Sequence, residues 1–423
     1  MLVKLVNKTQ LIICILLANA TLNVFSDSVN HETLYKSGYV WDGADFVTRD
    51  LCVIDGVFVD LSMCKSPDET INLIGKYIVQ PYSDAHHHVT PSTKMASDNF
   101  LKQGIYYVLN PNTVIDGYSA EFYSKKETYD VITSMGGITA KGGHPEKLYN
   151  VSLNKWVYKN KPREYFLGNA YHILESEDQI DEILDTLVQQ GAQIVKIYLL
   201  DSNSYRINTS AWGDESFYVN YGLNPEFVQT LVEAIHGRGL RVIAHVENNN
   251  DVLLALKSGV DILGHLPAHG AYNENEKSKY LLTKKIVKEM KDRGMIVIPT
   301  YLIAKPRFNS DTSPQLAAQY STQGDNIKLL EKYKVPMLIG TDGFGSPTDE
   351  LSHLKTVSGL NNTVLLNMLF TTGQYIFPER KINCFEQDCE ASFLVLQSNP
   401  VKDLAALKNI ALWVKQGNVN TYD

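Results

Sequence analysis

The chain alternates helix-length amphipathic stretches with short apolar runs over most of its length. The stretches DQIDEILDTLVQQG, NPEFVQTLVEAIHGRG and NNDVLLALKSG carry apolar residues at helical spacing, and each ends in glycine. Each is followed by a run rich in branched apolar residues, namely AQIVKIYLL, LRVIAHV and VDILGHL. Continuously apolar strands are typical of parallel sheets that are buried on both faces. The pattern therefore predicts a repeating unit of one strand and one helix.

The same unit extends to both sides of this region. YIVQPYSDAHHH, GIYYVLN and GGITAKGGH fit three earlier strands, and MIVIPTYL and VPMLIGTD fit two later ones. NTVLLNMLFTTGQYIF fits a last helix, so the count reaches eight units between about Ile78 and Phe377. A barrel of eight such units takes about 250 residues. We therefore expect an α/β fold in which residues 78–379 form a (β/α)8 TIM barrel.

The flanks of this region have a different pattern. Residues 31–77 and 380–423 read as short strands, with Asp-Gly turns in the first segment. We expect the two segments to fold together into one small β-sandwich domain beside the barrel. A long polar and aromatic insert, from Asp201 to Gly222, follows the fourth expected strand. Loops on that face of a barrel shape substrate pockets, so the insert is expected to be a lid or specificity loop.

Composition and charge narrow the class of protein. The chain has 423 residues, is 44% hydrophobic and carries a formal net charge of −8, which argues against nucleic acid as a partner. Lys4 and Lys8 precede the apolar run LIICILLANA, which indicates a signal peptide over residues 1–20. An uncleaved N-terminal anchor is the alternative. We expect a secreted or periplasmic protein without membrane contact once the signal is removed.

Removal of residues 1–20 takes Cys14 away and leaves four cysteines, which are Cys52, Cys64, Cys384 and Cys389. An even number of cysteines in an exported protein suggests disulfides. Pairing within each local pair and cross-linking between the two pairs are both open. None of the four lies in a barrel motif, so a structural role is expected.

Six residues that can bind metal stand at the ends of the strand-like runs. The carboxyl ends of barrel strands meet at one face, so these side chains are expected to converge there. Alternation along a strand places His86 and His88 on the same side, with His87 pointing away. Imidazole suits Zn, Mn, Fe, Co or Ni, and zinc is the metal we expect. The six are His86, His88, Lys196, His245, His265 and Asp342.

Lys196 and Asp342 carry the chemistry of this predicted centre. A protonated lysine repels cations, so Lys196 joins the site only if it is deprotonated or converted by CO₂ to an anionic, bridging carbamate. An ordinary strand-end lysine is the alternative. Asp342 can contact a metal, accept a proton from an attacking water and return it to a leaving group, so it is a predicted catalytic residue.

These residues, taken together, resemble the amidohydrolase superfamily over nearly the whole mature chain. Asp84-Ala85-His86-His87-His88 is similar to the Asp-x-His-x-His motif of strand one, and the other ligands follow in the family's order. The resemblance implies one metal on His86, His88 and Asp342. It implies a second metal on His245 and His265, with carboxylated Lys196 bridging both. The nearest subgroup resembles imidazolonepropionase and prolidase, although Cys389–Leu396 lacks the usual Gly and Ala-Asp.

Further residues are candidates for contact with substrate. Gly142-Gly143-His144 resembles a loop-three motif of prolidase-like members, and His144 is expected to bind the carbonyl or stabilise a tetrahedral intermediate. A plain loop role is the alternative. The candidate substrate-binding residues are Arg206, Tyr218, Tyr221 and His269.

The expected function is hydrolysis of an amide or cyclic-amide C–N bond by an exported two-metal enzyme. Dipeptides, N-acyl amino acids and similar small molecules suit this chemistry. An ester, lactone or phosphotriester hydrolase, a one-metal deaminase or cyclic-imide hydrolase, and a non-catalytic secreted metal-binding protein are the alternatives. A homo-oligomer is left open.

Overall fold

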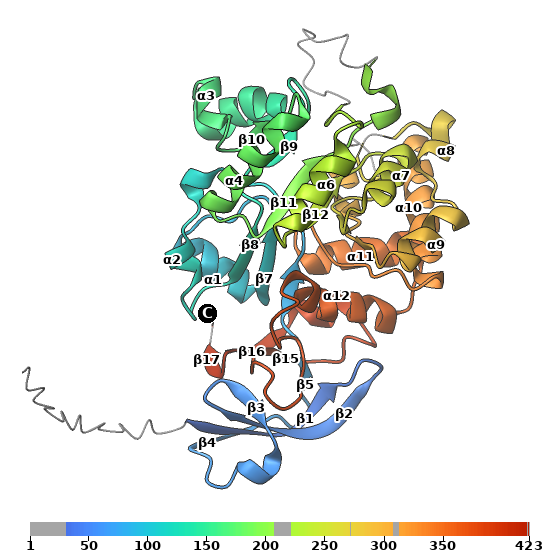
Figure 1. Ribbon diagram of the computed structural model, residues 1–423. Helices are drawn as coiled ribbons and strands as arrows, with labels where there is room; N and C mark the ends of the chain where they lie inside the picture. Colours follow the sequence, from blue (N-terminus) through green and yellow to red (C-terminus); the bar gives the residue numbers. More distant parts are fainter. Residues whose placement is uncertain (1–30, 207–220, 271, 308–312, 421, 423) are drawn as a thin grey trace, which may run out of the picture.

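The computed structural model describes residues 31–206, 221–270, 272–307, 313–420 and 422 (Figure 1). A β-rich unit lies at one end, where the first strands (blue) and the last strands (red) come together. Helices and parallel strands make up the remainder. No helix in these described ranges is long and apolar enough to cross a membrane.

The β-rich unit is one mixed sheet of eight strands in the order β17-β16-β15-β5-β1-β2-β3, with β4 also paired to β1. Both chain segments contribute, because Leu394 pairs with Val79. Tyr35, Phe58 and Phe393 pack in its apolar interior. Its strands are β1 (Glu32–Trp41), β2 (Phe46–Ile54), β3 (Val57–Val59), β4 (Glu69–Asn72), β5 (Tyr77–Val79), β15 (Phe393–Leu396), β16 (Ile410–Lys415) and β17 (Asn418–Asn420).

Two disulfides stabilise this unit. Cys52 of β2 bonds to Cys64, and Cys384 bonds to Cys389, each with 6.0 Å between the Cα atoms. The sequence left three pairings open, and the structure contains the two local ones. Neither bond lies among the predicted metal-binding residues.

The other strands are parallel and form two sheets, with the orders β6-β7-β8 and β10-β9-β11-β12-β13-β14. Hydrogen bonds also run between the sheets. Gln193 N donates to Thr133 O (2.9 Å), and Ala85 N donates to Ile339 O (2.8 Å). The strands are β6 (Tyr82–Asp84), β7 (Ile105–Asn110), β8 (Asp130–Thr133), β9 (Gly137–Thr139), β10 (Tyr171–Ile173), β11 (Ile194–Tyr198), β12 (Arg241–His245), β13 (Ile262–Leu263) and β14 (Ile296–Val297).

Amphipathic helices cover these strands. Gly191 and Gly259 end α4 and α7 in the left-handed conformation, at φ 94° and 83°, which confirms the predicted glycine stops. The helices are α1 (Lys94–Lys102), α2 (Ala120–Tyr123), α3 (Arg163–Phe166), α4 (Ile180–Gln190), α6 (Val228–Gly237), α7 (Asn249–Ser258), α8 (Lys277–Tyr280), α9 (Lys284–Asp292), α10 (Pro314–Lys332), α11 (Pro347–Ser358) and α12 (Asn362–Ile376).

Short helices occupy the connections between these elements. They are η1 (Leu61–Met63), η2 (Ile115–Gly117), η3 (Leu148–Tyr158), η4 (Glu177–Gln179), η5 (Ser202–Ser204), η6 (Glu274–Glu276), η7 (Tyr301–Arg307) and η8 (Leu404–Lys408). The segment η3 has π-helical hydrogen bonding and was not predicted.

Three expected strands differ from the prediction. The last of the barrel, VPMLIGTD, forms no strand, and only Met337 makes an isolated parallel bridge, to Val297. The first is divided, because Tyr77–Val79 pairs in the mixed sheet while Tyr82–Asp84 pairs with β7, and Pro81 between them has no N–H to continue a ladder. The third, expected in GGITAKGGH, is limited to β9 (Gly137–Thr139), and β8 before it was not predicted; Met135 takes a left-handed conformation (φ 57°) between the two. The described strands thus form α/β sheets without one ladder that closes on itself.

A partly buried ion-pair network joins the mixed sheet to the parallel strands. Arg380 donates to Asp130 Oδ2 and to Glu390 Oε2, both at 2.7 Å, and Lys415 donates to Asp130 Oδ1 at 2.8 Å. Asp130 opens β8, whereas Glu390 and Lys415 belong to the C-terminal segment of the mixed sheet. The network therefore connects the two parts of the fold.

We expect Arg380→Met to lower the free energy of unfolding by about 1 to 3 kcal/mol, because it leaves two carboxylates that are mostly shielded from water without their main counter-charge. Arg293→Met is the matched control. Its pair with Glu289 is surface-exposed, so the cost is below about 1 kcal/mol. Urea denaturation measures both values, and equal costs for the two variants would contradict the assignment.

Candidate metal centre

Three of the predicted metal-binding residues form a first group at the end of β6. His86 Nε2 lies 3.1 Å from His88 Nε2, and Asp342 Oδ1 lies 3.4 Å and 3.1 Å from these two nitrogens. Backbone pairing brings them together, because Asp342 N donates to His86 O at 2.7 Å. Asp342 itself takes a left-handed conformation (φ 55°), which points to a constrained position.

Asp84 holds this group in place from behind. Its buried carboxylate accepts hydrogen bonds from His86 N (3.1 Å), Thr341 N (3.0 Å) and Thr341 Oγ1 (2.7 Å). His87 Nδ1 lies 3.2 Å from the same carboxylate. Asp84 thus orients both strand ends that carry the first group, which gives the aspartate of the motif a physical role.

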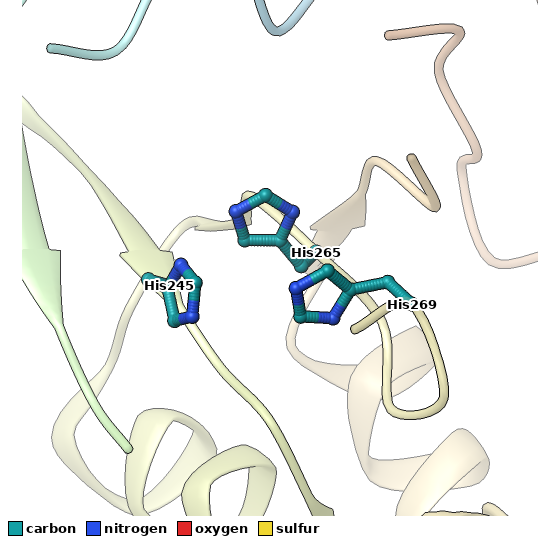
Figure 2. Close-up of side chains that lie close together, drawn as sticks. All are labelled: His245, His265 and His269. Atoms are coloured by element: carbon teal, nitrogen blue, oxygen red, sulfur yellow. The ribbon is translucent and has the colours of Figure 1, made fainter. Parts of the chain in front are cut away.

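A second group consists of His245, His265 and His269 (Figure 2). One ring nitrogen of each lies within 4.8 Å of the others. His245 ends β12, and the other two residues follow β13. The two groups adjoin, because the ring centroids of His86 and His265 are 4.4 Å apart. His269 was predicted as a substrate contact, whereas the structure places it beside the predicted metal-binding histidines.

Lys196 is buried close to both groups. Its Nζ has no hydrogen-bond partner in the described part of the chain, and burial lowers its pKa to about 7, although Asp342 acts in the opposite direction. A Cβ atom on Gly264 would lie 3.0 Å from Lys196 Nζ and 3.2 Å from His86 Cε1. A side chain at this position would therefore crowd Lys196 and His86.

The electrostatics of the site favour neutral imidazoles. Burial first, and then neighbouring positive groups, lower the pKa of His86, His144 and His265 well below the ordinary value. Burial alone would raise the pKa of Asp342, but the hydrogen bond with His88 and the charge of His86 lower it overall. Neutral imidazole and ionised carboxylate are the forms that bind metal ions.

The outer nitrogens of two of the rings face fixed acceptors. His88 Nδ1 lies 3.0 Å from Asn112 O, and His265 Nδ1 lies 2.7 Å from Thr300 Oγ1. Because Thr300 Oγ1 donates to Pro299 O, it accepts from His265. Such contacts keep the proton on the outer nitrogen and direct the lone pair of Nε2 inwards. The donor types of the two groups therefore fit a bound metal, and at His88 and His265 the orientation of the ring fits as well.

The other predicted contacts lie in different places. The His144 ring is centred 5.1 Å from His245 and 5.2 Å from Tyr198, at the rim of the two groups. Tyr221 is buried and supports the His144 loop, since its carbonyl accepts from His144 N at 3.0 Å. Arg206 forms an exposed ion pair with Glu226, and Tyr218 lies outside the described residues.

Sequence reasoning missed three residues near the groups. Glu247 Oε1 lies 3.1 Å from His245 Nε2, and Tyr198 is centred 5.7 Å from the His245 ring. Each stands two positions after a predicted ligand, so strand alternation could have identified both. Glu350 accepts from Tyr301 N (2.9 Å) and Leu302 N (2.7 Å), directly after Thr300. No sequence signal marks Glu350.

Comparison with known proteins gives a structural match only. No protein-family model and no curated protein sequence matches the chain. The crystal structure of an amidohydrolase superposes with a TM-score of 0.70 at 18% identity, covering 93% of this chain and 99% of that one. The chain has the amidohydrolase fold. The predicted resemblance is thereby confirmed at the level of the fold, and the subgroup stays a prediction.

Two further structures share the amidohydrolase fold with this chain. A Xaa-Pro dipeptidase with methionine bound in its active site gives a TM-score of 0.69 at 16% identity, covering 92% of this chain and 100% of that one. The ochratoxinase of A. niger gives 0.71 at 14% identity, with 92% and 95% covered.

We expect Gly264→Ala to weaken metal binding by about tenfold or more, because the added methyl group crowds Lys196 and His86. Gly117→Ala is the control, since a Cβ atom there has no neighbour within 4 Å. Elemental analysis after dialysis against a chelator measures the retained metal. Equal retention by the two variants would show that the space above Gly264 is not needed.

The buried carboxyl group of Glu350 should make the free energy of unfolding depend on pH. Burial raises its pKa to about 8, against the hydrogen bonds from Tyr301 and Leu302. The folded state holds this proton more tightly than the unfolded state, so the contribution is present below about pH 4.5 and is lost as the pH rises towards 8. In metal-free protein, the free energy of unfolding of the wild type should fall relative to Glu350→Gln between pH 5 and pH 8. The exposed control Glu274→Gln should keep the wild-type slope.

Proposed function

We propose that this protein is an exported, metal-dependent hydrolase that cleaves an amide or cyclic-amide C–N bond of a small-molecule substrate. The observation that carries the proposal is the pair of adjoining groups around His86 and His265, set at strand ends in the amidohydrolase fold. The similarity to a Xaa-Pro dipeptidase and to an ochratoxinase favours an amide among the possible bonds. Dipeptides and N-acyl amino acids are the substrate classes we would test first.

The proposal includes a finer account of the fold. We take residues 78–379 as a (β/α)8 barrel and residues 31–77 with 380–423 as the small domain. Hydrogen bonds between the two parallel sheets support this reading. They run from Gln193 to Thr133 on one side, and from Leu338 to Val297 and from Ala85 to Ile339 on the other.

Two divalent metal ions, for which we propose zinc, would be held by these residues. His86, His88 and Asp342 would hold one, and His245 and His265 the other. Lys196 would bridge them as a carbamate, because its amine is buried, unpaired in the described part of the chain and easily deprotonated. The neutral amine would attack CO₂, so that a C–N bond forms as one C=O π bond opens to an oxyanion, and the released amine proton would pass to water. Bound ions would acidify water and polarise a carbonyl oxygen.

The side chains of the site support the proton transfers of amide hydrolysis. Asp342 is held ionised, so it accepts the proton of the attacking water as the C–O bond forms. It then returns the proton to the nitrogen as the C–N bond breaks, which lets the amine leave. His144 stands at the rim and would donate a hydrogen bond to the carbonyl oxygen as negative charge develops there.

Export is supported by the two disulfides. Bonds between cysteines persist in oxidising compartments and are rare in the cytosol. The proposed signal peptide, residues 1–20, lies outside the described residues.

The test combines metal content, native mass and activity. We expect about two metal ions per chain, an added CO₂ in the native mass that disappears in Lys196→Ala, and hydrolysis of members of an amide library. Asp342→Asn should reduce the rate by about 10² to 10⁴-fold, whereas the exposed control Asp292→Asn should not.

Three other outcomes would contradict parts of this proposal. Hydrolysis of esters but not of matched amides would overturn the proposed bond specificity. One metal ion that is unchanged by Lys196→Ala would remove the carbamate from the mechanism. Tight metal binding without any turnover would favour a binding protein.

A further inference from the structure

The turn after β13 holds a residue in an unfavourable backbone conformation. Ala268 has φ +74°, which lies in the left-handed backbone region that residues other than Gly, Asn and Asp rarely adopt. Ala268 is also buried, so water does not compensate for the geometry. Residues kept in such conformations gather at functional sites, where the surrounding structure fixes them. The turn ends at His269.

Buried polar side chains clamp this turn. Gln319 and Gln323 of α10 both donate to Ala268 O, at 2.9 Å and 2.8 Å, and Tyr301 Oη donates to Pro267 O at 3.0 Å. All three side chains are fully buried. Several buried donors that hydrogen-bond to two adjacent carbonyl groups hold the turn in a single conformation. The position of His269 is therefore set by the α10 side of the fold as well as by β13.

The clamped turn points the His269 ring towards His265 and His245. His269 Nδ1 lies 3.1 Å from Leu266 O, so this nitrogen carries the proton and the lone pair is on Nε2. The ring is centred 4.2 Å from His265 and 5.5 Å from His245 (Figure 2). Glu247 Oε1 lies 3.9 Å from His269 Nε2 and 3.1 Å from His245 Nε2, which places a carboxylate beside two of the three rings.

We propose that His269 is a third imidazole ligand of the second metal position, so that His245, His265 and His269 bind a zinc-like divalent cation without needing Lys196. Three histidines are a common protein ligand set for zinc, with a further position open. The resemblance to other amidohydrolases implies only His245, His265 and the lysine at this position. The proposed role of His269 is therefore particular to this chain.

The order of assembly follows from this ligand set. Three imidazoles would hold the second cation first, and the carbamate of Lys196 would form afterwards in a site that already contains positive charge. An anionic carbamate is stabilised there, whereas in the metal-free pocket it would be a buried charge with Asp342 nearby. The inference rests on the proposed metal centre but not on turnover.

The experiment titrates metal-free protein with Co²⁺ and with Zn²⁺ in competition with a chelator, and resolves the two dissociation constants. His269→Asn keeps a donor near the Nδ1 position and removes Nε2, whereas His269→Gln keeps a polar atom near the Nε2 position. We expect His269→Asn to weaken the second ion by about 10 to 100-fold and to leave the first unchanged. His269→Gln should weaken it less, and Lys196→Ala should still bind the second ion.

The controls separate ligation from folding. His172 is buried away from both groups, so His172→Asn should bind both ions as the wild type does. Thermal midpoints of the metal-free variants show whether each one folds. The Co²⁺ absorption spectrum of the second ion should change in His269→Asn, which a purely structural role would not produce.

Two results would overturn the inference. His269→Asn and His269→Gln could both bind two ions with wild-type constants and spectra, or Lys196→Ala could abolish the second ion while His269→Asn retains it. Absence of amide hydrolysis, with metal binding as expected, would instead defeat the proposed function and leave the role of His269 standing.

Discussion

The candidate site depends on the attachment of the segment 339–342 to the end of β6. Asp84 accepts from Thr341, and Ala85 and His86 form backbone hydrogen bonds with this segment, although the partners are 254 to 257 positions apart along the chain. Without it, Asp342 would not reach His86 and His88. A buried carboxylate with several donors in place thus joins the first parallel strand, β6, to the segment that follows the bridge between Met337 and β14.

Burial then determines the protonation of the side chains in the centre. His86, His265 and Lys196 lie in a region with little water, where carrying positive charge is costly, so burial lowers the pKa of all three groups. The same desolvation that makes the pocket unfavourable for a protonated lysine makes it favourable for a cation with anionic partners. Acidic residues behind the rings, such as Asp84 and Glu247, supply that balancing charge.

Much of the parallel α/β region follows from local sequence. Apolar runs that follow glycine-terminated helix stretches were enough to place β11, β12 and β13. Strand alternation was enough to put His86 and His88 on one side. The breaks in the strands were less visible. Methionine is not a residue type that indicates a left-handed turn, so the conformation of Met135 was not predicted. The sequence of η3 lacks helical periodicity. The surroundings of His269 depend on α10, about 50 residues away, which no local pattern encodes.

The mixed sheet has a consequence for how the chain acquires its structure. β5 is flanked by β1, which lies before it, and by β15, which is made more than 300 residues later. Until the C-terminal segment arrives, β5 is a sheet edge with unpaired backbone groups, and such edges promote aggregation. Pairings this distant along the chain also form slowly. The protein must therefore protect an open edge during synthesis, and the final strands act as the cap that ends this exposure.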